Sequence, residues 1–130
     1  MEETLSRELE DRLGEGAAAA EAQAAADWFA SRIGQPLIIT KEEQGDSDQV
    51  LMTVSGVSVR RGDTRSDDYV DEDRIVLQGE GQIHPEAGRA AAPLPRDSYE
   101  IPFGPDTRCS ATSDELRLST ERASYRAYQQ

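Results

Sequence analysis

The sequence predicts an α+β domain in which an N-terminal helix, or two, packs on one face of a curved antiparallel sheet of five or six strands. Three observations support this fold class. Alanines with helical spacing dominate residues 17–33, apolar residues alternate from Pro36 onward, and no later helical stretch separates the alternating segments. Helices before strands argue against parallel βαβ units. We therefore expect a single domain over residues 1–130.

The first 34 residues are expected to form two helical pieces. Residues 1–15 carry leucines every four positions, which predicts a peripheral helix or flexible arm. Glycines at positions 14 and 16 interrupt the pattern, and the main helix of residues 16–34 ends at Gly34, before Pro36. We expect Trp28 at the edge of its apolar face. The residues on that face are Ala18, Ala22, Ala25, Ala26, Phe29 and Ile33.

Residues 36–127 are expected to form the antiparallel sheet, because the apolar period changes to about two. The alternation slips by one position at Ser55-Gly56, which predicts a β-bulge. Gly79 and Gly81 lie on the apolar phase of a later strand, and we expect the alanine-rich helix to occupy the space that they leave. The last strand is expected to run from Leu116 through Tyr125.

The composition is strongly acidic. The formal net charge is -12, from 26 Asp and Glu against 14 Lys and Arg, and Lys41 is the single lysine. This charge argues against nucleic acid and anionic membranes as partners, since both require clustered positive charge. It is typical of a halophilic or GC-rich prokaryote, where concentrated salt screens the repulsion. The alternative is an acidic surface that meets a specific basic partner.

The chain carries no sign of export. Its first residues, Met1-Glu2-Glu3, are acidic, and no apolar run reaches the about 20 residues that span a bilayer. A lone Cys109 forms no internal disulfide. We therefore expect a cytoplasmic protein.

No side chain has the partners that catalysis or metal binding requires. His84 is the only histidine and Cys109 the only cysteine, so we expect a surface imidazole and a small buried thiol. Arg61-Gly62-Asp63 is expected to be a turn. An acidic run without the EF-hand spacing is expected to be a solvated loop. It comprises Asp63, Asp67, Asp68, Asp71, Glu72 and Asp73. The sequence therefore predicts no catalytic residue, no metal and no cofactor.

Two groups of residues are candidates for binding. A cavity between helix and sheet would be lined by Met52, Tyr99, Phe103, Leu118 and His84, and chemistry there would be tested at His84, Asp97 and Tyr99. A locally basic, aromatic patch near the C-terminus would contact a partner. Its members are Arg122, Tyr125, Arg126 and Tyr128.

Three functions follow from these observations. The first is a non-enzymatic domain that binds another protein or a second copy of itself. The second is a protein, or an enzyme, that binds a small molecule between helix and sheet. The third is an inhibitor that imitates the charge of nucleic acid, which requires carboxylates aligned on one face.

Overall fold

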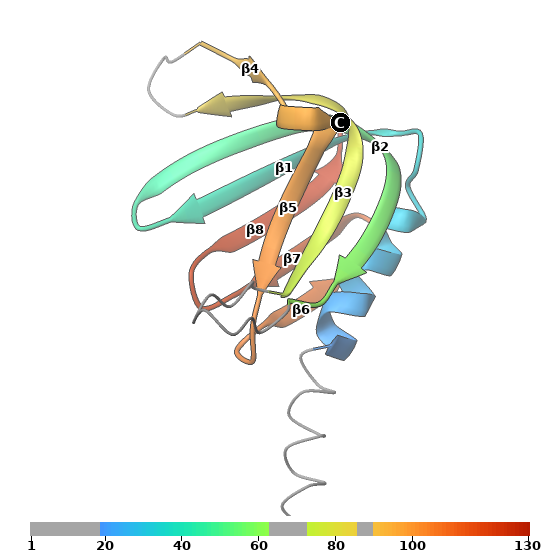
Figure 1. The fold of residues 1–130 in the computed structure, drawn as a ribbon, viewed down its shortest axis with the longest axis vertical. Coiled ribbons are helices and arrows are strands. Elements are labelled where there is room, and N and C mark those ends of the chain that lie inside the picture. The colour runs from blue at the N-terminus through green and yellow to red at the C-terminus, as the bar shows by residue number, and fades with distance from the viewer. Residues whose placement is uncertain (1–18, 63–72, 86–89) are drawn as a thin grey trace, which may run out of the picture.

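The computed structural model describes residues 19–62, 73–85 and 90–130, which form one α-helix and a single antiparallel sheet of eight strands (Figure 1). The strands are β1 (Pro36–Glu43), β2 (Asp46–Arg60), β3 (Asp73–Pro85), β4 (Ala92–Pro93), β5 (Ser98–Phe103), β6 (Arg108–Ala111), β7 (Glu115–Ser119) and β8 (Ser124–Gln129), and a 3-10 turn, η1 (Pro95–Asp97), precedes β5. Their order is β4-β3-β2-β1-β8-β7-β6, and β5 also pairs with β3. The expected α+β fold with five or six strands is therefore wrong, because these residues are mostly sheet.

The helix covers residues 19–30 of the described chain. Ala22, Ala25 and Phe29 are buried at helical spacing, and Trp28 is only 6% exposed, so it belongs to the core and not to its edge. Ile33 instead is 48% exposed, because the helix has already ended. No described helix is both long and apolar enough to cross a membrane. The expected arm of residues 1–15 lies outside the described residues.

The helix ends in a turn that leads directly into the sheet. Gly34 has a φ of +88°, a conformation that favours glycine, and Pro36 then starts β1. The Gly34 N–H donates to the carbonyl of Val54 at 2.9 Å, so the helix end is fixed to β2. β1 and β2 are joined by Gln44 and Gly45, which both have positive φ, as a two-residue hairpin turn with the twist of the strands requires.

The predicted β-bulge is present in β2. The pairing of β2 with β3 shifts between Val54 and Gly56, so Val57 and Val59 return to the core side of the strand. The two glycines of β3 have another role than expected. A Cβ on Gly79 would lie 2.0 Å from the Thr53 carbonyl oxygen, and one on Gly81 would lie 2.4 Å from that of Leu51. Strand β2, and not the helix, fills this space.

Two threonine turns join the last three strands, and the second of them divides the expected last strand. Thr112 joins β6 to β7, and its hydroxyl accepts from the N–H groups of Asp114 and Glu115 at 3.2 and 3.1 Å. Thr120 repeats this arrangement between β7 and β8, with its hydroxyl accepting from Arg122 and Ala123. The expected last strand from Leu116 through Tyr125 is therefore two strands.

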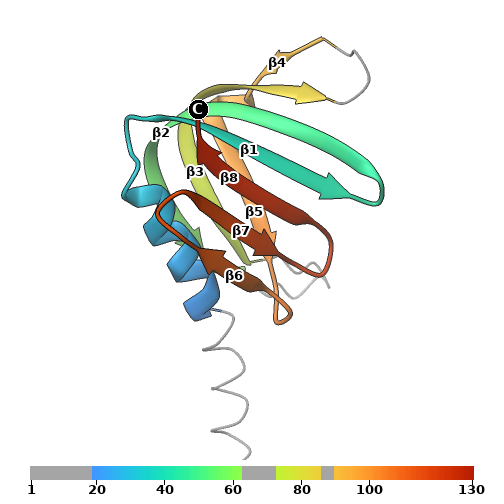
Figure 2. The same cartoon turned by 180° about the vertical axis from the view of Figure 1, so that it is seen from behind.

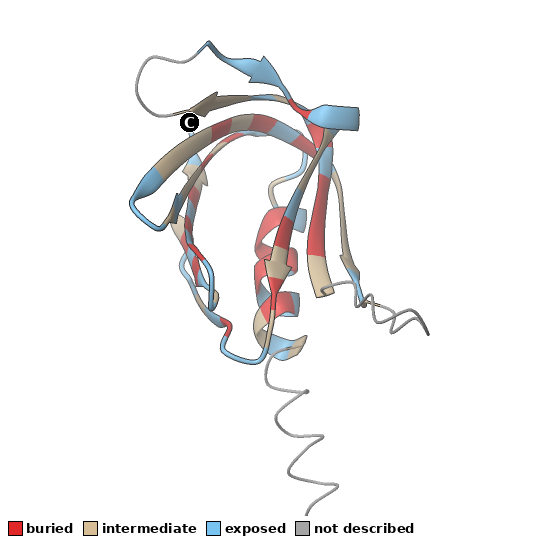
Figure 3. Ribbon diagram, turned by 60° about the vertical axis from the view of Figure 1, so that its left-hand side comes forward, coloured by how far each residue is buried: buried red, intermediate tan, exposed pale blue. Residues whose placement is uncertain are grey.

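The sheet curves so strongly that the helix lies between its two sides (Figure 3). The helix also lies along the outer edge of β6. The Glu21 carboxylate accepts from the Cys109 N–H at 2.5 Å, and the Trp28 indole donates to the Thr112 carbonyl at 2.8 Å. An uncovered strand edge is a template for unwanted pairing, and the helix occupies this one.

At the other end of the sheet, β4 and β5 pair with different parts of β3, and the outer edge of β5 pairs with no other described strand. Ser98 donates its N–H to Pro95, and Pro102 has no N–H. Since alternate residues point to the same edge, Glu100 is the remaining donor there.

The inner face of the sheet and the buried face of the helix form one hydrophobic core. Its largest fully buried side chains include Phe29, Leu37, Ile39, Ile75, Leu77, Ile101, Leu116 and Leu118. The alternate residues of the same strands lie on the outer face, and this face of β6, β7, β8 and β1 carries the candidate site.

Candidate functional site

Three arginines lie on the outer face of three adjacent strands. Arg117 of β7 is directly opposite Arg126 of β8, and Arg108 of β6 is opposite Ser119 of β7. Their neighbours Leu116, Leu118 and Tyr125 are buried, so strand alternation directs the arginines outward. In Figure 2 these strands lie side by side in front, with β3 and β5 behind them.

The arginines line a groove of about 630 Å³, which we call the arginine groove. This volume lies within the range of about 300–1,000 Å³ found for small-molecule sites. Hydroxyl groups alternate with the arginines, and Glu42 lies at the β1 side of the groove. The hydroxyl residues are Thr40, Ser47, Ser110, Ser119 and Ser124. Cationic and hydroxyl donors thus share one concave surface.

Glu115 holds two of the arginines together. Its two carboxylate oxygens accept from Nε of Arg117 at 2.9 Å and from Nε of Arg126 at 2.7 Å. Without this bridge, two like charges directly opposite on a sheet would repel. The hydrogen bond from Arg126 is the main reason why the pKa of Glu115 is lowered, and the same contact raises the pKa of Arg126. The carboxylate is therefore a permanent anion at neutral pH.

The bridge uses only one nitrogen of each arginine. Within the described part of the chain, the Nη atoms of Arg117 and Arg126 donate no hydrogen bond, and the two side chains are 67% and 54% exposed. The Arg126 guanidinium also lies 4.9 Å from the Tyr128 ring centre. The terminal nitrogens of both guanidinium groups are thus available to a ligand.

The structure separates the members of the expected partner-contact patch. Arg126 and Tyr128 lie next to each other on the outer face, as described above. Tyr125 points inward and is only 6% exposed, and Lys41 lies over its ring at 5.9 Å. Arg122 is exposed in the turn before β8.

The expected cavity residues are packed together in the core. Met52, Phe103 and Leu118 are buried there, and Tyr99 packs against them. His84 does not join this group, because it pairs with Gln49 and lies on the outer phase of β3. The space between helix and sheet is occupied by side chains of the core.

Two candidate reactive groups, the Tyr99 phenol and the Cys109 thiol, have raised pKa values and are protonated at neutral pH. Burial raises the pKa of Tyr99, with further contributions from Tyr125, Asp48 and Glu43. Burial also raises the pKa of the Cys109 thiol, and Glu21 adds to that effect. A raised pKa lowers the fraction of thiolate, which is the nucleophilic form.

The described residues offer no metal centre, because no three of their His, Cys, Asp or Glu side chains form a group that could hold an ion. Most of the expected acidic loop, from Asp63 to Glu72, lies outside the described residues. Asp73 is described, and it accepts from the Gly62 N–H at 2.7 Å and from Arg61 at 3.2 Å. Arg61 is thereby paired within the chain.

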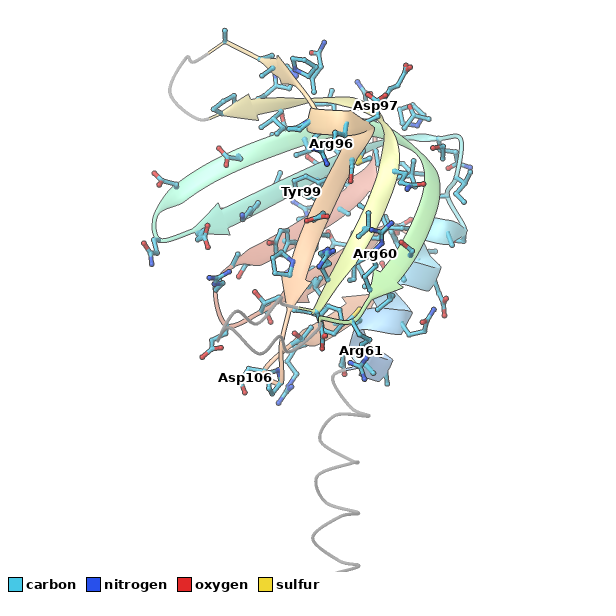
Figure 4. The ribbon with its side chains drawn as sticks, in the orientation of Figure 1. Arg60, Arg61, Arg96, Asp97, Tyr99 and Asp106 are labelled. Carbon is cyan, nitrogen blue, oxygen red and sulfur yellow. The ribbon has the colours of Figure 1, made fainter. Side chains whose placement is uncertain are left out.

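A second polar hollow, of about 570 Å³, lies on the outer face of β2 and β3 beside η1. Two of its residues, Arg96 and Asp97, have φ values of 55° and 51°, which are unusual for residues other than glycine. Figure 4 places them at the η1 end of the molecule, far from Arg61 and Asp106.

Sequence reasoning missed Arg108 and Arg117. A usable signal exists, because residues 108–126 contain four arginines and three carboxylates in a chain of net charge -12. Alternation directs Arg117 and Arg126 away from their apolar neighbours Leu118 and Tyr125, but only the pairing of the strands brings them onto one face with Arg108.

Fold and site together define a small β-sheet protein with a basic groove on its outer face. Residues 18–130 match the family described as YmzB-like protein, and the chain belongs to this family. A protein of Bacillus subtilis (strain 168) named "Uncharacterized protein YmzB" is 36% identical over 104 residues, covering 75% of this chain and 86% of that protein. No solved structure matches the chain.

Proposed function

We propose that this domain is a non-enzymatic binding protein whose ligand is a small anion held in the arginine groove. The observation that carries this proposal is the gathering of Arg108, Arg117 and Arg126 in one groove of an otherwise acidic chain. Arginine is the residue best suited to bind carboxylate and phosphate groups, because its planar guanidinium donates several hydrogen bonds at once.

The net charge limits the size of the anion. A protein of charge -12 repels polyanions such as nucleic acid at long range. At physiological salt the screening length is about 8 Å, so the groove attracts an anion only at close approach. A compact ligand with one or two anionic groups meets this condition, whereas a long polyanion would extend over the acidic surface.

The absence of an activated group supports binding without catalysis in the described part of the chain. Tyr99 and Cys109 both have raised pKa values, and His84 lies on another part of the outer face, over β2 and β3. A general base requires a partner that orients it and a pKa near the working pH. Among the described residues, none of these three side chains has such an orienting partner at the groove.

A second candidate function is contact with another protein or a second copy of the chain, through Arg126 and Tyr128. Their stacking at 4.9 Å on the outer face favours it, because arginine and tyrosine are enriched at protein interfaces. Sedimentation of the purified chain over a hundredfold concentration range tests self-association, and a mass that stays monomeric removes that variant of the proposal.

We do not favour an inhibitor that imitates nucleic acid. Described carboxylates lie on the helix, on the β1–β2 hairpin, on β5 and in the turn after β5, and not in one row. Examples are Glu21, Glu43, Asp46, Glu100 and Asp106.

Thermal unfolding of the full chain with a panel of small anions tests the proposal. Ionic strength is held constant with NaCl, since salt alone stabilises a chain of this charge. A bound anion at 100 times its dissociation constant is expected to raise the melting temperature by at least about 5 °C. Arg117→Gln should reduce this rise by about half or more at the same anion concentration, and Arg60→Gln, at an exposed arginine outside the groove, should retain it. If no anion raises the melting temperature above the NaCl control, the proposal fails.

A further inference from the structure

The arginine groove has two ends of opposite charge. Arg108, Ser119, Ser124 and Glu42 follow one another in register across β6, β7, β8 and β1. Since neighbouring strands are about 4.8 Å apart, the backbones of Arg108 and Glu42 are separated by about 14 Å across the strands. A ligand in the groove therefore meets guanidinium groups over β6 to β8 and a carboxylate over β1.

The cationic end offers more donors than one carboxylate can accept. Arg117 on β7 and Arg126 on β8 are directly opposite each other on the same face, and each presents two Nη atoms. Arg108 adds a third guanidinium, of which one Nη donates to the Thr107 carbonyl at 3.0 Å. The hydroxyl of Ser110, opposite Arg117, lines the same part of the groove. A carboxylate has two oxygens in one plane, whereas a phosphate monoester presents three oxygens and up to two charges.

Glu115 directs how the arginines can bind. Because Nε of Arg117 and of Arg126 donates to Glu115, neither arginine can present its Nε side to a ligand. The remaining donors are the paired Nη atoms at the end of each guanidinium. Two such ends, on strands that lie side by side, can hold different oxygens of one tetrahedral group.

The β1 end of the groove, at Glu42, suits ligand groups other than anions. Glu42 accepts hydrogen bonds and repels a second anion, so it suits hydroxyl or ammonium groups. Thr40 and Ser47 add hydroxyls at this side of the groove. The volume of about 630 Å³ also exceeds what a bare phosphate requires.

From this arrangement we propose that the ligand is a phosphate monoester of a small hydroxylated or amine-bearing molecule, with its phosphate between Arg108, Arg117 and Arg126 and its body extending toward Glu42. This inference rests on the proposed function of the groove and names its ligand class. Net charge in the groove supports it, because three arginines against Glu42 and Glu115 leave one positive charge on a chain of net charge -12.

Calorimetric titration of the full chain tests the ligand class. The probes are glucose 6-phosphate, glycerol 3-phosphate, inorganic phosphate, glucose, gluconate and citrate, all at one ionic strength. We expect the two phosphate esters to bind at least about tenfold more tightly than inorganic phosphate, gluconate or citrate, and glucose not to bind. Carboxylates that bind as tightly as the esters would overturn this inference and leave the proposed function intact. No binding by any anion would remove both.

Variants locate the two ends of the ligand. Arg117→Gln and Arg126→Gln are each expected to weaken binding of glucose 6-phosphate by about tenfold or more, and Arg60→Gln should leave it unchanged. Glu42→Gln should raise the affinity for inorganic phosphate and lower the preference for the ester over inorganic phosphate. A preference that is unchanged in Glu42→Gln would contradict the placement of the ligand body.

A measurement on the unmodified protein guards against variants that fail to fold. In amide correlation spectra, glucose 6-phosphate should shift the signals of Ser110, Ser119 and Ser124, which line the groove. Thr53 and Ser55 line the second hollow and serve as controls. Shifts confined to the second hollow would overturn the assignment of the site.

Discussion

The indole Nε1 of Trp28 donates a hydrogen bond of 2.8 Å to the carbonyl oxygen of Thr112, which lies 84 residues further along the chain. This bond joins the helix to the turn between β6 and β7. The Arg32 guanidinium lies 3.8 Å from the same indole ring and donates to the Ser113 carbonyl at 2.6 Å. The helix is therefore fixed to the last hairpins by polar contacts as well as by apolar packing.

Trp28→Phe is expected to lower the free energy of unfolding by about 1–3 kcal/mol, because the Thr112 carbonyl loses its donor while most of the apolar packing remains. Urea unfolding followed by circular dichroism measures the change. Ile33→Ala is the control, since Ile33 is 48% exposed and should alter stability by less than about 0.5 kcal/mol. Equal effects of the two substitutions would show that the indole hydrogen bond contributes little.

Gly79→Ala should destabilise the fold by about 3 kcal/mol or more. Its Cβ would lie 2.0 Å from the Thr53 carbonyl oxygen, and its φ of +154° disfavours a side chain. Gly104→Ala is the matched control, because nothing lies within 4 Å of its added Cβ. Thermal unfolding of both variants gives the comparison, and a Gly79→Ala protein as stable as Gly104→Ala would contradict the close approach of β2.

The raised pKa of Tyr99 predicts that the free energy of unfolding falls at alkaline pH. Burial raises its pKa in the folded state above the value of about 10 in the unfolded chain, so folding favours the protonated phenol. This contribution is fully present below about pH 10 and is lost as the pH rises further. In Tyr99→Phe the pH dependence of urea unfolding between pH 8 and 11 should be weaker than in the parent protein. The same pH dependence in both proteins would show that Tyr99 has the same pKa in the folded and unfolded states.

Glu21 contributes to the low reactivity expected of the Cys109 thiol. Burial first and the Glu21 charge second raise the pKa of the thiol, so alkylation by iodoacetamide should be slow at pH 8. Glu21→Gln removes the charge and should shift the pH–rate profile of alkylation to lower pH. Glu42→Gln is the control, because it removes a carboxylate that does not raise the pKa of Cys109, and its pH–rate profile should stay unshifted. An unshifted profile in Glu21→Gln would leave burial as the sole cause.

The faces of the strands could be predicted from the sequence, but the number of strands could not. Alternation and the slip at Ser55-Gly56 follow from side-chain geometry within one strand, and the bulge is confirmed. The turn at Thr120 contains neither glycine nor proline, and its hydroxyl hydrogen bonds become visible only in the folded chain. The predicted last strand therefore ran through a turn.

The arginine groove depends on which strands become neighbours. Thr40 and Arg126 are far apart in the sequence and lie opposite each other, because β8 inserts between β1 and β7. No local pattern predicts that order. Alternation alone does separate Tyr125 from Arg126, since consecutive strand residues face opposite sides. The same rule places Arg126 with Tyr128.

The blunted outer edge of β5 has a consequence for the behaviour of the protein at high concentration. With Pro102 lacking an N–H and Ser98 already bonded to Pro95, an incoming strand from another molecule finds a single donor, at Glu100. A hydrogen-bond ladder between molecules would lack two of its three donors along that border, which disfavours fibre growth. Even where concentrated salt removes the mutual repulsion of the acidic chains, this edge of the sheet is a poor template for pairing with a second molecule.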